Sequence, residues 1–279
     1  MKEKYIVEKE GELLSYLYEV MDLSKKKVKQ YLTHGSIYVN HTRTTQYDYP
    51  LEKGMVITVH SKASSMLPFD ILYEDDYIIV IDKPSGLLTV ATAKEKENTV
   101  YHMVSQYLKS GKHRSKVFVV HRLDRDTSGV LLFAKDEKTK KQLQENWDQY
   151  ASVREYKAIV EGVPKKCEAR LVNQLKETTT HLVYVAKEGR EAITSYQVEK
   201  SKNGLSRLRI FIETGRKNQI RVQLAHIGIP ILGDKKYQKK TEGKRLYLHA
   251  TRLKVFHPVV GKVMTFASSL PVEFQSVMK

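Results

Sequence analysis

A short polar run, residues 121–129, contains the side chains whose types and spacing best suit chemistry. It reads His-Arg-Leu-Asp-Arg-Asp-Thr-Ser-Gly and lies between two apolar, strand-like segments, residues 117–120 and 130–134. A loop between strands is held by a rigid scaffold and can present its side chains. Carboxylates beside arginines stay ionised, so Asp124 and Asp126 suit a nucleophile or base better than a general acid. On composition alone, a charged turn with internal salt bridges explains the run equally well.

The chain is strongly basic, with 48 Lys and Arg against 32 Asp and Glu and a formal net charge of +16. The excess is concentrated between residues 201 and 262, where 15 basic residues stand against 3 acidic ones. A polyanion is the natural partner. Because the basic residues are interleaved with strand-like and helix-like apolar residues, nucleic acid is favoured over a membrane surface. A basic surface that only improves solubility is the alternative.

The chain length and the cysteine count limit the class of protein. The 279 residues, 41% of them hydrophobic, suffice for one large domain and a small one. A single cysteine, Cys167, cannot form an intramolecular disulfide, and the N-terminal residues contain no apolar signal segment. No apolar run approaches the roughly 18 residues of a membrane span. We therefore expect a cytoplasmic protein with no membrane partner.

Residues 1–62 have the pattern of a small separate domain. Apolar residues recur at helical spacing over 13–20, and a second, lysine-rich helix is expected over 24–32. Gly35 is placed to end that helix. Alternating apolar residues then indicate short strands, the last of them over 54–59.

The stretch 63–68 is small and polar and ends in proline, which is typical of a linker. Over residues 69–279, strands alternate with occasional helices without the regular period of a doubly wound fold. Residues 77–81 should form a buried strand, and apolar residues over 100–108 recur at helical spacing. We expect an α+β domain with a mixed, largely antiparallel sheet.

The run at 121–129 resembles the signature of the RluA-type pseudouridine synthases, His-Arg-Leu-Asp-x-x-Thr-Ser-Gly followed by an apolar strand. It matches that signature at every defined position. Members of this family isomerise uridine in RNA to its C-glycoside. The resemblance implies a pseudouridine synthase catalytic fold for residues 69–279 and an essential role for Asp124, whereas Asp126 falls at a variable position.

Further blocks agree with the family in order and content. Residues 154–162 are similar to the second block, whose tyrosine stacks on the target base, and Tyr156 is the matching residue. Residues 213–225 are similar to the third block, whose arginine pairs with the catalytic aspartate, and Arg221 matches it. The similarity continues in the segments 82–86, 228–234 and 246–250.

The chain departs from the family pattern at three places. Asn218 stands where a histidine is usual, and Ser268 and Ser269 replace the common Ala-Pro. Residues 87–92 lack the usual histidine-containing ending. None of these changes falls on the three residues that the resemblance assigns to the active site. The turn before 87–92 would border the RNA, so a change there could alter which uridine is accepted.

The implied reaction breaks the N1–C1′ bond, turns the base and joins C5 to C1′, without redox change or energy input. The sequence accordingly lacks a phosphate-binding loop, a dinucleotide fingerprint and Cys/His metal spacing, and we expect no cofactor. Asp124 would attack the sugar or the base, or remove a ribose proton, and the sequence leaves these routes open. Arg221 would keep Asp124 ionised and oriented. Tyr156 would stack on the extruded base, the alternative being a cross-strand core tyrosine.

Several basic residues are candidates for RNA contacts. Arg216 and Lys217 begin a helix expected over 216–227, whose backbone N–H groups would add to a phosphate-binding corner. The apolar residues of that helix are expected to face the core: Ile220, Leu224 and Ile227. Arg122 and Lys83 could contact the RNA backbone or brace their own turns, and the sequence does not separate these roles. For His121 we favour a hydrogen-bonding role beneath the loop over proton transfer.

The N-terminal residues resemble the S4 RNA-binding module. The resemblance is carried by the two-helix and small-sheet plan, the lysine-rich second helix and the run Gly-Ser-Ile-Tyr-Val-Asn at 35–40. It implies an S4-like RNA-binding domain that contacts RNA through the lysines of the second helix: Lys25, Lys26, Lys27 and Lys29. A packing subdomain whose lysines are only solvated is the alternative.

We therefore expect an RNA pseudouridine synthase that acts on structured RNA as a monomer, with ribosomal RNA favoured over transfer RNA. A non-catalytic RNA-binding or ribosome-assembly protein on the same fold is the alternative, which the complete set of Asp124, Tyr156 and Arg221 disfavours. A metal-dependent nuclease using His121 and the two aspartates is a weaker third reading, because the neighbouring arginines compete with a metal.

Overall fold

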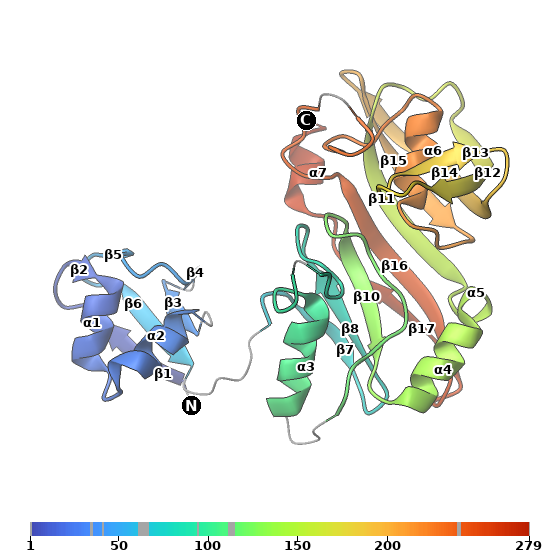
Figure 1. Cartoon of the computed structure of the whole chain (residues 1–279). Helices are drawn as coiled ribbons and strands as arrows, with labels where there is room; N and C mark the ends of the chain where they lie inside the picture. The colour runs from blue at the N-terminus through green and yellow to red at the C-terminus, as the bar shows by residue number, and fades with distance from the viewer. Residues whose placement is uncertain are drawn as a thin grey trace. The chain divides into compact units, whose positions relative to one another are not determined.

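The computed structural model describes residues 2–33, 36–40, 42–60, 67–93, 95–110, 115–238 and 241–278. The chain divides into two compact units, Met1–Pro68 with Met103–Arg114, and Phe69–His102 with Ser115–Lys279 (Figure 1). The helix stop expected at Gly35 and residues 63–66 of the expected linker lie outside the described residues.

The first unit is two helices packed on a small antiparallel sheet. The helices are α1 (Leu13–Val20) and α2 (Lys25–Thr33). The strands are β1 (Lys2–Ile6), β2 (Gly11–Glu12), β3 (Ile37–Val39), β4 (Thr42–Thr44), β5 (Pro50–Leu51) and β6 (Val56–His60). The sheet has the order β1-β6-β3-β4, and β2 pairs with β5. The predicted helices and the predicted strand near 54–59 are therefore confirmed.

The core of this unit follows from the helical and strand periods of the sequence. Leu13 and Leu17, four residues apart, are buried from α1, and Val28 and Leu32 are buried from α2. They pack in one cluster with Ile57 and other strand residues. The four lysines of α2 are exposed.

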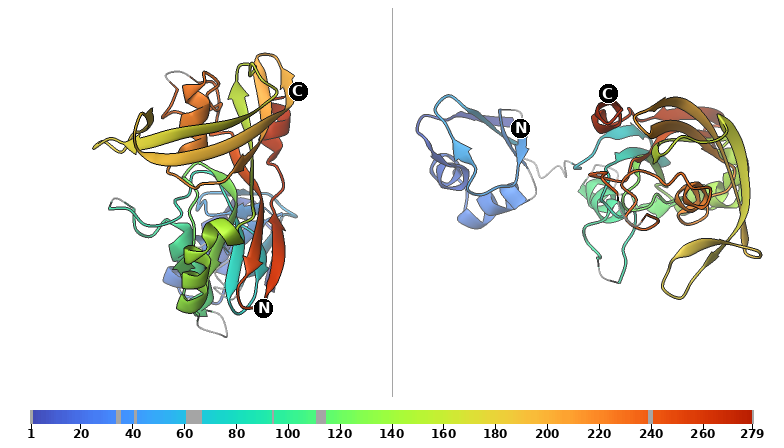
Figure 2. Two further views of the ribbon diagram at one scale, coloured as in Figure 1. Left: turned by 90° about the vertical axis from the view of Figure 1, so that its right-hand side faces the viewer. Right: turned by 90° about the horizontal axis from the view of Figure 1, so that it is seen from above.

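The second unit is built on one large twisted sheet, which Figure 2 shows from two further directions. Eleven described strands pair in the order β13-β12-β14-β15-β11-β16-β10-β8-β7, with β17 on β16 and β9 on β10. Of these pairings, β10 with β16 is parallel and the others are antiparallel. The prediction of an α+β fold with a mixed, largely antiparallel sheet is confirmed.

The elements of the second unit have the following bounds. The strands are β7 (Ile71–Glu74), β8 (Ile78–Lys83), β9 (Phe118–Val119), β10 (Ser128–Ala134), β11 (Val153–Glu161), β12 (Glu168–Glu177), β13 (Val183–Ala186), β14 (Arg190–Lys202), β15 (Leu205–Ile212), β16 (Leu248–His257) and β17 (Lys262–Ala267). The helices are α4 (Glu137–Glu145), α5 (Trp147–Tyr150), α6 (Gln219–His226) and α7 (Val272–Ser276). Helix α3 (Val100–Ser110) begins in this unit, and its residues from Met103 onward are grouped with the first unit.

Strand β10 is buried along its whole length. Val130 and Leu132 point into a cluster with Ile78 of β8 and Leu143 of α4. Leu131 and Phe133, on the opposite face of the strand, are buried as well. Because both faces are covered, the segment has a continuous apolar run and no alternation. This strand anchors the C-terminal end of the polar run that carries Asp124.

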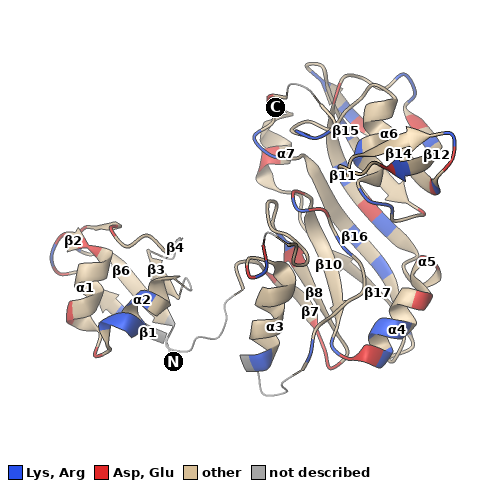
Figure 3. Ribbon diagram, viewed as in Figure 1, with Lys and Arg blue, Asp and Glu red and all other residues tan. Residues whose placement is uncertain are grey.

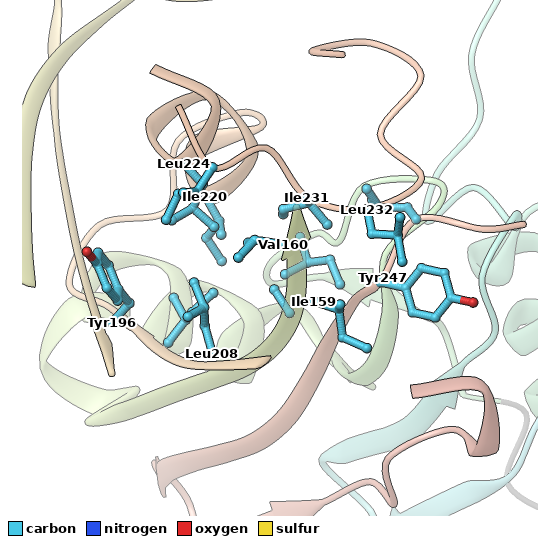
Figure 4. Packing of buried hydrophobic residues seen from close by; sticks show 14 of the residues in the cluster. Ile159, Val160, Tyr196, Leu208, Ile220, Leu224, Ile231, Leu232 and Tyr247 are labelled. Carbon is cyan, nitrogen blue, oxygen red and sulfur yellow. The ribbon is translucent and has the colours of Figure 1, made fainter. Parts of the chain in front are cut away.

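Helix α6 packs on the other half of the sheet. Figure 4 shows Ile220 and Leu224 of this helix against Val160 of β11 and Leu208 of β15. The predictions of buried Ile220 and Leu224 are confirmed, but Ile227 is 40% exposed and its predicted burial is wrong. The helix has ended at His226, so Ile227 no longer follows its apolar stripe.

The predicted start of this helix at residue 216 is also wrong, since α6 begins at Gln219. Asn218 has a left-handed backbone with φ of +54°, which a helix cannot continue through. The side chain of Gln219 folds back and accepts hydrogen bonds from the Arg216 N–H and the Thr214 hydroxyl, at 3.0 and 2.8 Å.

Among the described residues, no helix has both the length and the apolar character that a membrane span requires.

Candidate active site

The polar run enters β10 through Gly129, whose lack of a side chain the fold requires. Gly129 has a φ of +111° and pairs with Ala250 in the parallel contact between β10 and β16. A Cβ at this position would lie 2.2 Å from the Ala250 carbonyl oxygen. The run can therefore approach β16 closely only with glycine here.

The turn that follows β8 fixes the loop from the other side. The Ser85 hydroxyl donates to the Asp126 carbonyl at 2.7 Å, and the Thr89 hydroxyl donates to the Leu123 carbonyl at 2.7 Å. The Gly86 N–H donates to the Arg125 carbonyl at 3.0 Å. The carbonyl groups that accept these bonds lie on both sides of Asp124. The main chain from which the Asp124 side chain projects is therefore held rigidly.

Lys83 belongs to this bracing. Its side chain is 0% exposed, and Nζ donates to the carbonyls of Pro84, Leu87 and Arg125 at 2.9, 2.7 and 2.8 Å. Three acceptors take all three donors of an ammonium group. Burial lowers the pKa of Lys83 to about 7, and the nearby Asp126 and Asp124 oppose that shift. Of the two roles that the sequence left open for Lys83, an RNA contact and bracing of its own turn, these contacts support bracing.

Arg221, from the middle of α6, reaches the carboxylate of Asp124 across 97 residues of sequence. Nη1 donates to Asp124 Oδ2 at 3.2 Å. The guanidinium is also held bidentately by Asp234, with Nε and Nη2 each 2.8 Å from a carboxylate oxygen. Burial opposes the charged guanidinium, but the hydrogen bonds and charge of Asp234, with a contribution from Asp124, raise the pKa of Arg221 above its usual value.

Tyr156 comes from β11, at a register shift between Glu155 and Tyr156 in the pairing with β16. Burial raises the pKa of Tyr156 to about 12; Arg154 opposes this shift and Asp124 adds to it. Tyr156 lines one pocket together with Asp124 and Arg221. Three predicted residues from separate parts of the sequence thus meet around one cavity. The cavity also has an apolar lining, which the sequence did not indicate: Leu123, Ile212, Ile220 and Leu248.

His121 lies under the loop and makes structural contacts. Its Nε2 accepts a hydrogen bond from the Leu132 N–H at 3.1 Å, and its ring stacks on Trp147 at 4.6 Å. Burial, with the nearby Arg154, lowers the pKa of His121 to about 3. The histidine is therefore neutral near pH 7, and the hydrogen-bonding role favoured from the sequence is confirmed.

The basic residues predicted to touch RNA differ in their surroundings. Arg122 and Arg216 are exposed and border the cavity. Lys217 is exposed but forms an ion pair with Glu177. The Arg216 backbone N–H is already bonded to the Gln219 side chain, so the phosphate-binding corner expected from a helix starting at 216 is not formed.

The second aspartate of the run lies apart from this cavity. Asp126 forms an ion pair with Arg125 at 3.7 Å, in which the Arg125 side chain is 66% exposed and the Asp126 side chain 49% exposed. It is not among the residues that line the cavity. Within the described part of the chain, no group of three or more His, Cys, Asp or Glu side chains is arranged to hold a metal ion.

Two of the departures from the family pattern have clear structural consequences. Asn218 accepts a hydrogen bond from Arg221 Nη1 at 3.1 Å and donates one to the Tyr237 hydroxyl at 2.9 Å. Ser268 donates to Asp82 at 2.7 Å and lies 3.0 Å from Nε2 of the buried His249. The other nitrogen of His249 lies 2.9 Å from the Ser128 hydroxyl, so the serine completes a buried polar chain to the polar run.

Comparison with known proteins points to one family. A family model described as RNA pseudouridylate synthase matches residues 77–226. A ribosomal large subunit pseudouridine synthase D of Vibrio cholerae is 32% identical over 275 residues, covering 90% of this chain and 84% of that protein. An uncharacterized RNA pseudouridine synthase of Bacillus subtilis is 29% identical over 279 residues, covering 96% of this chain and 92% of that protein.

Among solved structures, human RNA pseudouridylate synthase domain containing 4 has the same fold, with a TM-score of 0.61 and 24% identity over 74% of this chain and 90% of that chain. The family match covers more than half of the sequence and includes Asp124, Tyr156 and Arg221. The chain therefore belongs to the RluA-type RNA pseudouridine synthases, enzymes that isomerise uridine in RNA to pseudouridine.

Proposed function

We propose that this enzyme isomerises uridines of structured ribosomal RNA, with Asp124 as the reacting carboxylate, Arg221 as its orienting partner and Tyr156 as the base-stacking residue. The observation that carries the proposal is the contact between Asp124 and Arg221 at the wall of a cavity that Tyr156 also lines. The isomerisation is redox-neutral, so these groups need no small-molecule cofactor.

The charge distribution supports RNA as the substrate. Lys and Arg residues are spread over the strands of the second unit (Figure 3), and Arg122 and Arg216 border the cavity itself. Such residues bind phosphate without reading sequence. Relatives named ribosomal large subunit pseudouridine synthase D, including the one from Vibrio cholerae, support ribosomal RNA over transfer RNA.

The chemistry begins with extrusion of the uridine from its stack. Unstacking costs a few kcal/mol, and stacking on an aromatic ring returns about 1–3 kcal/mol, which is the part we assign to Tyr156. With a pKa of about 12, the Tyr156 phenol is protonated near neutral pH and enters the reaction as a ring and a hydrogen-bond donor. Asp124 then attacks the sugar or the base, or removes a ribose proton, and all three routes use the same carboxylate.

We assign an accessory RNA-binding role to the first unit, with an S4-like domain over residues 1–62, a linker over 63–68 and the catalytic domain over 69–279. The exposed lysines of α2 support this assignment: Lys25, Lys26, Lys27 and Lys29. They add positive charge that can pair with phosphates outside the catalytic cavity. We further propose that the enzyme works as a monomer in the cytoplasm.

The test is release of tritium from RNA labelled at uracil C5, because every isomerisation passes that label to water. We expect release from ribosomal RNA to exceed release from transfer RNA. Asp124→Asn should abolish release while RNA binding persists, and Asp126→Asn, a matched change two residues away, should leave release intact. No release from any cellular RNA pool would favour the non-catalytic RNA-binding alternative, and loss of binding in Asp124→Asn would make Asp124 structural.

A further inference from the structure

The guanidinium of Arg221 is shared unequally between two carboxylates. Nε and Nη2 form two parallel bonds of 2.8 Å with the two oxygens of Asp234. A single bond of 3.2 Å joins Nη1 to Asp124. Bidentate pairing fixes the plane of a guanidinium, whereas a single bond leaves it free to rotate. The orientation of Arg221 is therefore determined by Asp234 more than by Asp124.

Asp234 is itself held in place on several sides. It is 1% exposed, and its Oδ1 also accepts hydrogen bonds from the N–H groups of Lys236 and Tyr237 at 3.0 and 3.2 Å. The preceding Gly233 has a φ of +80°, and a Cβ there would lie 1.7 Å from the Arg245 carbonyl oxygen. The backbone just before Asp234 is thus held close to that of Arg245, and the carboxylate is fixed by four hydrogen bonds.

The face and the remaining edge of the guanidinium are also occupied. The ring of Tyr237 lies 5.3 Å from Arg221 Cζ, and its hydroxyl accepts a hydrogen bond from Asn218. Asn218 in turn accepts from Nη1 at 3.1 Å. Nη1 has two hydrogens. With one of them directed at Asn218, the other is directed at Asp124.

The balance of charge also indicates that Asp234 is the main partner of the Arg221 guanidinium. Arg221 is 8% exposed, so its charge needs a partner, and the fully buried Asp234 supplies it. Asp124 is 29% exposed and meets a guanidinium that is already paired. Its second oxygen, Oδ1, is not engaged by Arg221 in the bonds described. Without Asp234, Arg221 could turn and take both oxygens of Asp124.

We propose that Asp234 is a positioning residue for catalysis: it holds Arg221 so that one N–H orients Asp124 and leaves an oxygen of that carboxylate for the substrate. The inference rests on the proposed role of Asp124 and adds a residue that does not itself line the cavity and that acts on Asp124 through Arg221. A displacement of about 1 Å in such a constellation can lower a rate on the order of 100-fold.

The experiment measures kcat and KM separately for Asp234→Asn, Arg221→Lys and the double variant, by tritium release from ribosomal RNA. We expect each single change to lower kcat on the order of 100-fold with KM for RNA retained. Because both changes break one unit, the double variant should be no slower than the slower single variant. A near-normal kcat for Asp234→Asn, or losses that multiply in the double variant, would overturn the proposal.

Asp234→Glu covers the case in which Asp234→Asn does not fold. It keeps the buried negative charge but moves the carboxylate by one methylene, so we expect a folded enzyme with reduced kcat. Full activity of Asp234→Glu would reduce Asp234 to charge compensation and refute a positioning role. Glu199→Gln is the matched control, since Glu199 pairs with Lys157 and Arg207 at 3.0 Å elsewhere on the sheet; its kcat should stay normal.

The outcome is separable from failure of the proposed function. If the unaltered enzyme releases no tritium, or Asp124→Asn retains release, the role of Asp124 fails and Asp234 has nothing to position. If the unaltered enzyme is active, Asp124→Asn is inactive and Asp234→Asn has a normal kcat, only the positioning role of Asp234 is refuted.

Discussion

Replacing Gly129 with alanine should disrupt the junction between the Asp124 loop and β10. A Cβ at residue 129 would lie 2.2 Å from the Ala250 carbonyl oxygen and 2.7 Å from the Ala250 nitrogen. Ordinary contact begins at 3.4 Å, so the backbone of β16 would have to move away by about 1.2 Å (3.4 − 2.2 Å) at this point. Both neighbours are main-chain atoms of a buried strand, which cannot move as a flexible side chain does.

Two terms contribute to the loss of unfolding free energy expected for Gly129→Ala. A non-glycine residue held at φ of +111° is strained by about 1–3 kcal/mol. Forcing a methyl group into a packed site adds about 1–3 kcal/mol. We expect Gly129→Ala to lower the free energy of unfolding by about 2–6 kcal/mol, which is a large part of the roughly 5–15 kcal/mol that stabilises a domain.

Urea denaturation at constant pH measures this free energy, with the slope checked for two-state behaviour. Gly204→Ala is the matched control, because Gly204 also has a positive φ, +73°, but has nothing within 4 Å of the added Cβ. It should lose only the backbone strain. Equal losses in Gly129→Ala and Gly204→Ala would refute the argument from close approach.

Three further predictions concern the site and its support. Tyr156→Leu should lower kcat/KM about 5- to 150-fold, the equivalent of 1–3 kcal/mol of stacking, in the tritium assay; an unchanged value would assign Tyr156 to the core alone. Lys83→Met should lower the free energy of unfolding by about 3 kcal/mol, since three buried carbonyls lose their donor, and should leave the salt dependence of RNA binding unchanged; a shallower salt dependence would restore Lys83 to the RNA interface. His121 and His249 have pKa values lowered by burial to about 3 and about 4, below the 6.5 of an unfolded histidine, so the unfolded chain binds more protons between these values. Stability should be complete above pH 6.5 and fall by about 3 kcal/mol or more by pH 4, and a flat urea midpoint over that range would contradict it.

Much of the secondary structure was predictable because it follows from local periodicity. The apolar spacing over 13–20 and 100–108 becomes α1 and α3, and the continuous apolar run at 77–81 becomes β8 apart from its first residue. The boundary of α6 was not predictable in this way. It depends on the left-handed backbone of Asn218 and on a hydrogen bond that the Gln219 side chain accepts from the Arg216 N–H. Neither feature produces a periodic pattern in the sequence.

The residues of the candidate site also divide into those that the sequence identified and those that only the structure revealed. The signature at 121–129 selected Asp124, and the matching blocks selected Tyr156 and Arg221, which the fold brings to one cavity. Asp234 lay in a matching segment, but its sequence context contains nothing that indicates a partner. Its pairing with Arg221, thirteen residues earlier, is seen only in the folded structure, where two guanidinium nitrogens donate to its carboxylate.

Lys83 shows most clearly what the sequence alone could decide. From its type and its place in a turn, a bracing role and an RNA contact were equally acceptable, because a lysine can donate to a phosphate or to a carbonyl with the same group. The tertiary structure decides by burial: three carbonyls, one of them 42 residues away, surround the ammonium and exclude it from solvent. The sequence by itself determined the chemistry available at each position and the family of the enzyme. Which groups face the substrate and which support them depends on contacts between distant segments, and only the folded chain determines those.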